Sequence, residues 1–355
     1  MSILTKYILK KYLLNFTIVL ISLELFFVGI DFLQNFKDLP DSANLQLLYV
    51  LYNSFFTLTL ALPLSIVFGW IITLVLFIKN NELVAFNAIG SKSSDIYAPV
   101  VKVSLFLITL LILMQITPLA YSYEQKRKIL HNEYFTNTKT DIFLKYNDNY
   151  IYFKKLYPLE KKAEDIYIYK IKDRDIVQSI VAKNAYFKDN KWQVVDVKII
   201  NKPINMNLDT SKLEIRYEDF LNTLEGFKPK ILDNVYETKS NFSILDAVSA
   251  MILLTNQEIN TDKIRGALYN QIVVPFFVIP ILLLVFAWAS LNSRFFNVGK
   301  FTSLSIFGTL IIWGIFFMLF KFTNGGILIP EISILVPFII WVIGSLFFYK
   351  KKINY

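Results

Sequence analysis

The chain has 355 residues, is 55% hydrophobic and carries a formal net charge of +9, which together predict a polytopic membrane protein rather than a soluble one. The basic residues lie beside apolar stretches and in one polar insert, so anionic lipid is the expected partner and nucleic acid is not. There is no cysteine and a single histidine, His131, so neither a thiol nucleophile nor a His/Cys metal cluster is available, and no cofactor is expected.

Six stretches of about 20 apolar residues are each long enough to cross a bilayer. They are Leu13–Leu33, Phe55–Ile78, Ala98–Tyr121, Ala267–Leu291, Phe301–Phe322 and Ile332–Tyr349. The first is too long for a signal peptide and no small-residue cleavage site follows it, so we expect it to stay as an anchor.

The distribution of Lys and Arg between these stretches predicts the orientation. The basic positions that fall on one side are Lys6, Lys10, Lys11, Lys79, Lys92, Arg294, Lys300, Lys350, Lys351 and Lys352. The opposite loops carry fewer, with Lys37 after the first stretch and Lys321 at the end of the fifth. The positive-inside rule therefore predicts that both termini are cytoplasmic and that the insert from Ser122 to about Arg265 lies outside the cytoplasm.

The insert reads as β-structure over residues 122–240. Short β-branched or aromatic runs alternate with Asn, Asp, Lys or Pro, which is typical of a sandwich or jelly roll. The runs are Tyr150–Phe153, Asp165–Lys172, Ile176–Ala182 and Trp192–Ile199. In the last run Val195, Val197 and Ile199 alternate with polar residues, which predicts one core face.

A connecting helix is expected within residues 241–265, because Ser243 is a suitable N-cap before a periodic apolar stretch. The predicted fold is a membrane α-helical protein with six transmembrane helices and an inserted all-β, jelly-roll-like periplasmic domain. Residues 1–121 hold the first three helices and a cytoplasmic helix near 81–95, and residues 266–355 hold the last three.

The sequence Asn-Glu-Leu-Val-Ala-Phe-Asn-Ala-Ile-Gly at positions 81–90 follows the second apolar stretch. It resembles the cytoplasmic coupling segment of the lipopolysaccharide export permeases, the LptF/LptG (YjgP/YjgQ) family. Pro63 and Gly69 keep the family's spacing to Glu82. Further positions similar to the LptG branch are Pro118, Ile168, Tyr169, Gln178, Ser179, Trp192, Pro330 and Pro337. The resemblance covers essentially the whole chain and is closer to LptG than to LptF.

The resemblance implies a permease subunit of an ABC transporter that extracts lipopolysaccharide from the inner membrane. The implied partners are a second six-span permease (LptF-like), a cytoplasmic ATPase dimer (LptB-like) and periplasmic bridge proteins (LptC/LptA-like). None of the eleven glycines lies in a G-x-x-x-x-G-K-[ST] phosphate loop, so ATP hydrolysis is expected from a partner and not from this chain.

The resemblance assigns ATPase coupling to Glu82 and to the helix after it. The other coupling candidates are Leu83, Phe86, Ala88 and Gly90. A carboxylate at a helix start is favoured by the helix dipole and can also accept a charge-assisted bond from an arginine of the ATPase. The alternative is a helix-terminal charge without a partner.

Three adjacent cations, Lys126, Arg127 and Lys128, follow the third apolar stretch on the side where few charges are expected. They are candidates for gripping headgroup phosphates, although adjacent residues cannot share one helix face and at most two would reach a cavity. A solvated linker helix is the alternative. Only Lys128 keeps the family's spacing, and Gln125 stands where an arginine is expected.

Asp31 departs from the family pattern, because the LptG branch carries a lysine important for substrate near the outer end of the first helix. Lys37 takes that role only if the helix continues outward, and the position itself remains open. Lys321, at the outer end of the fifth stretch, is a further candidate for substrate binding.

Glu24 lies in the middle of the first apolar stretch, where an ionisable group is a functional candidate because an unpaired charge is costly in hydrocarbon. The alternative is a protonated carboxyl bonded to a neighbouring helix. Phe26, Phe27, Phe316 and Phe317 are candidates for a lateral gate, since the family opens between the first and fifth helices.

Two other functions remain as alternatives. A permease for another lipid or for a lipoprotein would share the layout, although those with a large periplasmic domain typically have four spans. A membrane sensor would need a cytoplasmic output domain, and no internal cytoplasmic segment exceeds about 20 residues.

Overall fold

A computed structural model describes residues 2–131, 139–146, 149–157, 160–172, 175–202, 212–225, 243–254, 261–289 and 296–353. The chain divides into two compact units. One is helical and contains residues 1–131, 241–247 and 262–355, and the other contains residues 132–240 and 248–261 and includes the sheet.

Five helices of the first unit are long and apolar enough to cross a membrane. They are α1 (Ile3–Gln34), α2 (Ala43–Lys79), α4 (Ser93–Ile116), α10 (Val298–Asn324) and a last one that starts with the π-helical turn η5 (Glu331–Leu335) and continues as α11 (Val336–Ile353). Short elements join them: η1 (Phe36–Asp38), α3 (Glu82–Ala88), η2 (Pro118–Tyr121) and α5 (Ser122–Leu130). The predicted apolar stretches one, two, three, five and six are thereby confirmed as helices.

The fourth apolar stretch falls on a bent pair of helices, which is either one broken span or a re-entrant loop. It consists of α8 (Asp262–Ile272), the 3₁₀ turn η3 (Val274–Phe277) and α9 (Val278–Trp288), and its two halves are bent by 43°. Pro275 lies in the turn and supplies no backbone N–H, so an uninterrupted ladder of helical bonds cannot form there. Counted as one span, this bent pair completes the six predicted crossings.

Helix α2 is the most buried of the apolar helices and packs against α1, α5, α9 and α10. It approaches α1 closely at Gly69, where a Cβ atom would lie 2.8 Å from the Phe16 Cα. Trp70, one residue on, is fully buried and donates from its indole nitrogen to the Leu282 carbonyl of α9 at 3.2 Å. A small residue at position 69 therefore sets how near the two helices approach.

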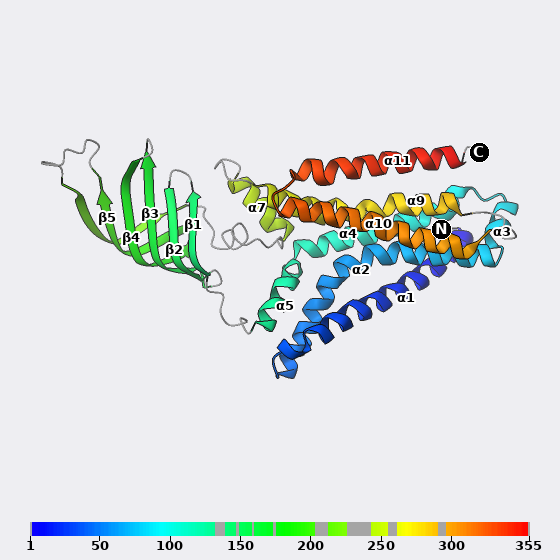
Figure 1. Ribbon diagram of the computed structural model, residues 1–355, viewed down its shortest axis with the longest axis horizontal. Coiled ribbons are helices and arrows are strands. Elements are labelled where there is room, and N and C mark those ends of the chain that lie inside the picture. The colour runs from blue at the N-terminus through cyan, green and yellow to red at the C-terminus, as the bar shows by residue number, and fades with distance from the viewer. Residues whose placement is uncertain are drawn as a thin grey trace. The chain divides into compact units, whose positions relative to one another are not determined.

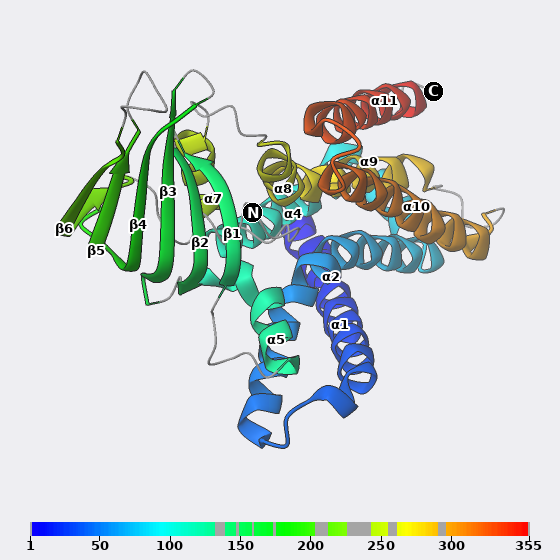
Figure 2. The ribbon, with the colours of Figure 1, turned by 60° about the vertical axis from the view of Figure 1, so that its left-hand side comes forward.

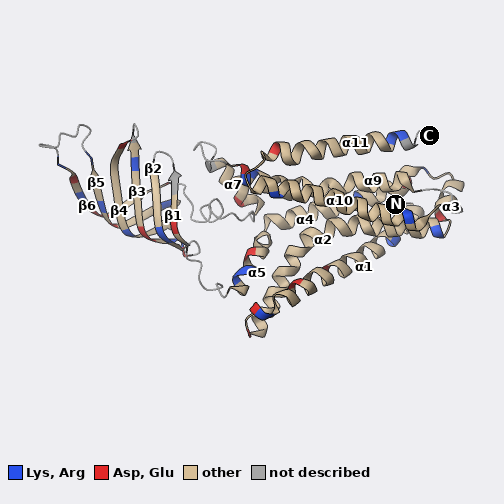
Figure 3. Cartoon of the chain, in the orientation of Figure 1, with Lys and Arg blue, Asp and Glu red and all other residues tan. Residues whose placement is uncertain are grey.

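Within the helical unit, α3 and both chain termini lie at one end, whereas η1 and α5 lie at the other (Figure 1). Charged residues are concentrated near these two ends, with long stretches of mostly uncharged residues between them (Figure 3). This arrangement matches helices whose middle portions face hydrocarbon.

The second unit contains one antiparallel sheet of six strands in consecutive order (Figure 2). The strands are β1 (Lys139–Tyr146), β2 (Asn149–Tyr157), β3 (Lys162–Lys172), β4 (Asp175–Lys188), β5 (Lys191–Asn201) and β6 (Glu214–Thr223). An inserted β region is thus confirmed. The described strands form one curved sheet rather than two packed ones, and β1 and β6 had no counterpart among the predicted runs.

A crease crosses the whole sheet at six aligned positions. These are Asp141, Lys154, Asp165, Lys183, Asp196 and Asp219, one from each strand in order. In β1, β3 and β5 the aspartate has a left-handed backbone, with φ of 58°, 51° and 55°, a conformation that Asp tolerates better than most residues. Within this row, the Lys154 Nζ and the Asp165 Oδ2 form an ion pair at 3.1 Å.

The crease changes which side chains face the core. Buried residues that flank it are separated by three positions instead of two, as with Phe153 and Leu156 or Val194 and Val197. The prediction that Val195 shares the core face with Val197 and Ile199 is therefore wrong, because the left-handed Asp196 turns the strand over between them. Trp192 and Val194 take the core positions on that side.

The return from the sheet includes α7 (Ile244–Leu254). The Ser243 hydroxyl accepts a bond of 3.2 Å from the Asp246 amide, which confirms Ser243 as the N-cap of the connecting helix.

Candidate functional site

Helix α3 contains four of the five predicted coupling residues, has seven residues and is delimited by left-handed positions. Asn81 precedes it with φ 57° and Gly90 follows it with φ 77°. At the second end, the Ser91 N–H donates to the Phe86 carbonyl at 3.1 Å and the Gly90 N–H to the Asn87 carbonyl at 3.0 Å. This pair of bonds is typical of a glycine-terminated helix, so Gly90 ends α3.

One face of α3 is docked and the other is exposed. Leu83 and Phe86 are buried, and the Phe86 ring lies edge-on to Phe77 of α2 at 5.4 Å and to Tyr7 of α1 at 6.4 Å. The exposed residues of α3 are Val84, Ala85, Asn87 and Ala88, and the exposed Ile89 follows as the C-cap. The sequence thus produces a short surface of mostly small and apolar side chains, with one amide, that is docked on two long helices.

Glu82 binds other parts of this chain. Its Oε2 accepts a bond of 2.9 Å from the Tyr7 hydroxyl and its Oε1 one of 3.0 Å from the Asn80 amide. The Lys11 Nζ lies 4.0 Å from Oε1. The carboxylate therefore connects α3 to the start of α1. A bond from Glu82 to an ATPase stays a prediction, and so does the alternative of a helix-terminal charge without such a partner.

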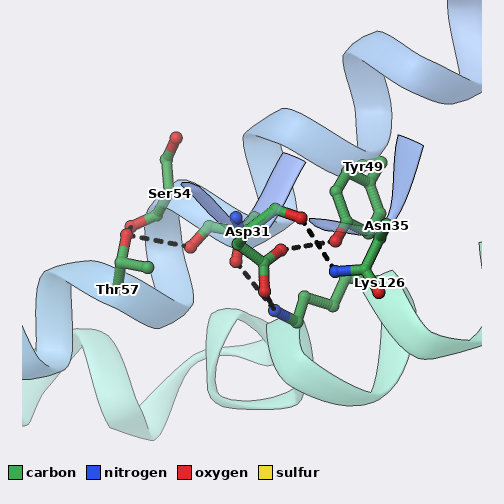
Figure 4. Close-up of polar contacts among 7 residues, drawn as sticks. Asp31, Asn35, Tyr49, Ser54, Thr57 and Lys126 are labelled. Carbon is green, nitrogen blue, oxygen red and sulfur yellow. Dashed lines mark hydrogen bonds and ion pairs between the residues drawn. The ribbon is translucent and has the colours of Figure 1, made fainter. Parts of the chain in front are cut away.

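A second cluster of predicted residues lies at the opposite end of the helical unit, where α1, α2 and α5 meet (Figure 4). The Lys126 ammonium of α5 lies 2.9 Å from Asp31 Oδ1 on α1 and 2.9 Å from Asn53 Oδ1 on α2. The other carboxylate oxygen of Asp31 accepts a hydrogen bond from the Tyr49 hydroxyl. Two residues that were proposed separately from the sequence are thus partners.

Aromatic rings enclose the same ammonium group. Nζ of Lys126 lies 5.1 Å from the ring centre of Phe56, 5.5 Å from Tyr123 and 5.9 Å from Tyr49. The lysine side chain is 6% exposed, against 27% for Asp31. The arrangement neutralises and buries Lys126, so the three adjacent cations do not act alike.

The unexpected acid at position 31 has a structural reason. Buried lysine needs a compensating charge because desolvation of an ammonium is costly, and Asp31 supplies it. Since the carboxylate already binds Lys126 and Tyr49, it is satisfied within the chain. A direct contact between Asp31 and substrate stays a prediction.

The other predicted cations differ in their contacts. Lys128 pairs with Glu124 one turn back at 2.7 Å, whereas Arg127 is half-buried and has no carboxylate partner among the described residues. Lys37 is exposed in η1, and Lys321 is exposed at the end of α10 with its ammonium 5.3 Å from the Phe317 ring centre.

Glu24 faces α2, where the Thr57 hydroxyl donates to its Oε2 at 2.7 Å. Its Oε1 is buried and has no hydrogen-bond partner among the described residues, and the same is true of the Asn53 amide nitrogen one turn from Thr57. Glu24 is therefore bonded to a neighbouring helix, as the second interpretation expected. Its protonation and any function stay predictions.

The four gate candidates have different surroundings. Phe26 is exposed and contacts Phe27 edge-on at 5.7 Å, and Phe317 stacks on Trp313 at 5.6 Å. Phe316 is buried against Phe277 and Phe338, at 6.1 Å and 6.3 Å between ring centres, and belongs to the helical core. In the described part of the chain no ring contact joins α1 to α10, and the gate stays a prediction.

Polar residues that no sequence pattern predicted complete these clusters. Tyr49, Asn53 and Tyr123 surround Lys126, and Tyr121 donates to the Asp246 carboxylate at the start of α7. Burial, together with this bond, raises the pKa of Tyr121 to about 12. Asn53 lies just before the second predicted apolar stretch, so hydropathy did not mark it, and no local pattern identifies its partner.

The described residues contain no group of three or more Asp, Glu or His side chains arranged to hold a metal ion. Both clusters connect helices. The bond between Tyr7 and Glu82 links α3 to α1, and the bonds from Lys126 to Asp31 and Asn53 link α5 to α1 and α2.

Comparison with known proteins identifies one family. A family profile described as "Lipopolysaccharide export system permease LptF/LptG" matches residues 6–351, which is nearly the whole chain. No individual curated protein matches. The profile covers both branches and does not distinguish one from the other.

Proposed function

Because the chain belongs to the LptF/LptG family of lipopolysaccharide export permeases, we propose that it is one permease subunit of an ATP-driven exporter that extracts lipopolysaccharide from the inner membrane. The family consists of transport permeases and is not a class of enzymes. The second permease subunit of the proposed exporter would be a related six-span protein, and a separate cytoplasmic ATPase dimer would hydrolyse ATP.

The position and surface of α3 carry this proposal. The helix and its C-cap expose Val84, Asn87 and Ile89, and Phe86 and Glu82 anchor the helix to the end of α2 and the start of α1. A small rigid helix with an exposed apolar side fits a groove on another protein. A push on α3 from the ATPase would therefore move α1 and α2 without being absorbed by a flexible loop.

The cytoplasmic location of α3 follows from the orientation that we propose, with both termini inside. The termini and α3 share one end of the helical unit (Figure 1), and Lys6, Lys10, Lys11 and Lys92 lie there. The β domain would then be periplasmic. The excess of basic residues in these short segments supports this orientation.

The cargo contact that we propose centres on Arg127. It is the member of the three-cation run without a carboxylate partner in the described part of the chain, and its planar guanidinium can bind a phosphate through two parallel bonds. Lys128 and Lys37 are secondary candidates. Lys126 would act on cargo only indirectly, because its charge is neutralised within the chain.

The sheet supports the proposed transfer of lipid to bridge proteins. Its last described strand, β6, is an edge strand on which Ile215, Tyr217 and Phe220 are 47%, 75% and 63% exposed. An uncovered edge can accept a strand from a partner. Strand addition at this edge would extend the sheet into an LptC-like or LptA-like protein.

The first experiment is co-purification. The chain is tagged, expressed with candidate permease and ATPase partners, and purified, and the bound proteins and lipids are identified by mass spectrometry. Recovery of an ATPase, a second permease and lipopolysaccharide would support the proposal. Recovery of phospholipid or a lipoprotein in place of lipopolysaccharide would instead indicate a different cargo, and purification of the chain alone would argue against the exporter assembly.

A further inference from the structure

We propose that the outer ends of α1, α2 and α5 form an ammonium-binding cage, that Lys126 is its internal occupant, and that this occupied cage locks α5 onto α1 and α2. The cage consists of Asp31, Asn53, Tyr49, Phe56 and Tyr123. The ligand class that fits it is a primary alkylammonium ion.

The contacts around Nζ satisfy what an ammonium ion needs. It has three N–H donors and no acceptor, and two oxygens lie 2.9 Å away, one from Asp31 and one from Asn53. The remaining surroundings are three aromatic rings with centres between 5.1 Å and 5.9 Å away. Rings at this distance attract a cation through their negative faces. A carboxylate, an amide oxygen and three rings are more than a chance surface ion pair provides.

Lys126 lies in the middle of the buried face of α5. The buried residues of α5 are Ser122, Lys126 and Ile129, which recur at helical spacing on one face. Ile129 packs with Leu39 and Tyr49 in a small apolar cluster beside the cage. Arg127 and Lys128 lie off this face and remain half-buried. The lysine thus serves as a polar anchor in an otherwise short and weakly apolar contact.

The cage joins segments that are far apart in the chain, since Lys126 is 95 residues from Asp31 and 73 from Asn53. Helix α5 follows the end of α4 through η2 and, in the chain, directly precedes the unit that contains the sheet. Locking α5 to α1 and α2 fixes the orientation of α5 relative to these two helices. If the proposed function holds, the lock also sets the direction of Arg127, so Lys126 and Asp31 are positioning residues for transport.

Chemical rescue tests the cage directly. In Lys126→Ala the ammonium and its stem are missing, so we expect the apparent Tm of the purified chain in detergent to fall by about 5 °C or more. Propylammonium should restore most of the loss in a saturable manner, whereas propanol, which has similar size and no charge, should not. Lys128→Ala is the matched control, because it removes a cation from the same helix but leaves the cage intact, and propylammonium should not change its Tm.

The proposed locking of α5 onto α2 is tested by measuring the distance between spin labels on the two helices. The chain has no cysteine, so spin labels can be placed at two exposed positions, His131 after α5 and Leu47 on α2. We expect one narrow distance distribution in the parent and in Lys128→Ala, a broad one in Lys126→Ala, and a narrow one again with propylammonium. A merely stabilising side chain would not give recovery that depends on a free ammonium ion.

Two further variants keep the test decisive if Lys126→Ala does not fold. Phe56→Leu removes one ring and retains the ion pair, and Asp31→Asn removes the carboxylate charge and retains the shape. Both should broaden the distance distribution. An unchanged distribution in both, or equal rescue of Lys126→Ala by propanol and propylammonium, would overturn the proposal. These measurements use no cargo, so they test the cage whether or not the chain exports lipopolysaccharide.

Discussion

Glu82 has two sets of possible partners, one inside the chain and one on the proposed ATPase. Replacing Glu82 by Ala removes the carboxylate from both. We expect the variant to fold and to lose ATP-driven lipopolysaccharide transport by roughly tenfold or more, because a charge-assisted bond contributes about 1.5–3 kcal/mol. Transport and ATPase activity are measured in reconstituted vesicles with the partner proteins.

Tyr7→Phe is the control for Glu82. It removes the hydroxyl that donates to Glu82 Oε2 but keeps the ring that packs on Phe86 and Phe77. If the internal bond alone matters, both variants should lose transport equally. Near-normal transport in Tyr7→Phe with a strong loss in Glu82→Ala assigns the effect to the partner, and normal coupling in Glu82→Ala contradicts the coupling role.

Gly69 gives a prediction about packing. A Cβ at this position would lie 2.8 Å from the Phe16 Cα, so Gly69→Val must push α1 and α2 apart. We expect a loss of about 1–3 kcal/mol, measured as a lower apparent Tm. Gly314→Ala is the matched control, since no atom lies within 4 Å of its Cβ position, and a similar loss there would contradict the explanation.

At the residue scale, the sequence identifies chemically unusual side chains better than it identifies their partners. Asp31 and Lys126 both stand out as charges at the ends of apolar stretches. Their pairing depends on how α1, α2 and α5 pack, and no local spacing encodes a contact between positions 95 residues apart. Gly90 is a different case, because the end of a helix is determined locally. Glycine at the end of the segment 81–90 agrees with the end of α3 in the structure.

At the element scale, the long helices could be predicted because about 20 apolar residues have few other uses. The bend between α8 and α9 depends on Pro275 within an apolar run, which hydropathy alone does not register. Strand β6 was not predicted, although Ile215 and Tyr217 alternate with Arg216 and Glu218. Its side chains are mostly exposed, so the alternation there does not mark a core face. In β5 the alternation is real but reverses at the crease.

The crease also provides a prediction for the sheet. Asp196 has φ 55°, a region in which a β-branched side chain is strained by about 1–2 kcal/mol. We therefore expect Asp196→Val to destabilise β4–β6 and Asp196→Gly to preserve them. Hydrogen exchange of the full-length protein, followed by mass spectrometry of peptides from these strands, measures the difference. Equal exchange in the two variants would mean that the backbone conformation at this position is not what bends the strand.

At the scale of the whole molecule, the orientation can be tested with single cysteines, since the chain has none. Exposed positions are Asn87 in α3, Lys300 in α10, Asp38 in η1 and Lys188 in β4. An impermeant maleimide applied to cells with a permeabilised outer membrane should label cysteines at 38 and 188. Cysteines at 87 and 300 should react only after the inner membrane is opened, and the reverse pattern would invert the proposed topology.

The layout of the molecule was the most predictable feature, because three apolar stretches, a polar insert and three more apolar stretches leave few architectures. The branch of the family and the partners could not be predicted, since those depend on surfaces that meet other chains. The Lys126 cage is an intermediate case. Asp31 and Lys126 could be singled out from the sequence, but their contact depends on how α1, α2 and α5 pack.

The crease has a consequence for how the sheet assembles. Its six positions alternate acid and base from β1 to β5, as Asp141, Lys154, Asp165, Lys183 and Asp196, and end with Asp219 on β6. A strand that paired one residue out of step would lose these opposite charges and bring core side chains to the wrong face. We therefore expect the row to disfavour misaligned strand pairing, least at β6, where Asp219 lies opposite Asp196.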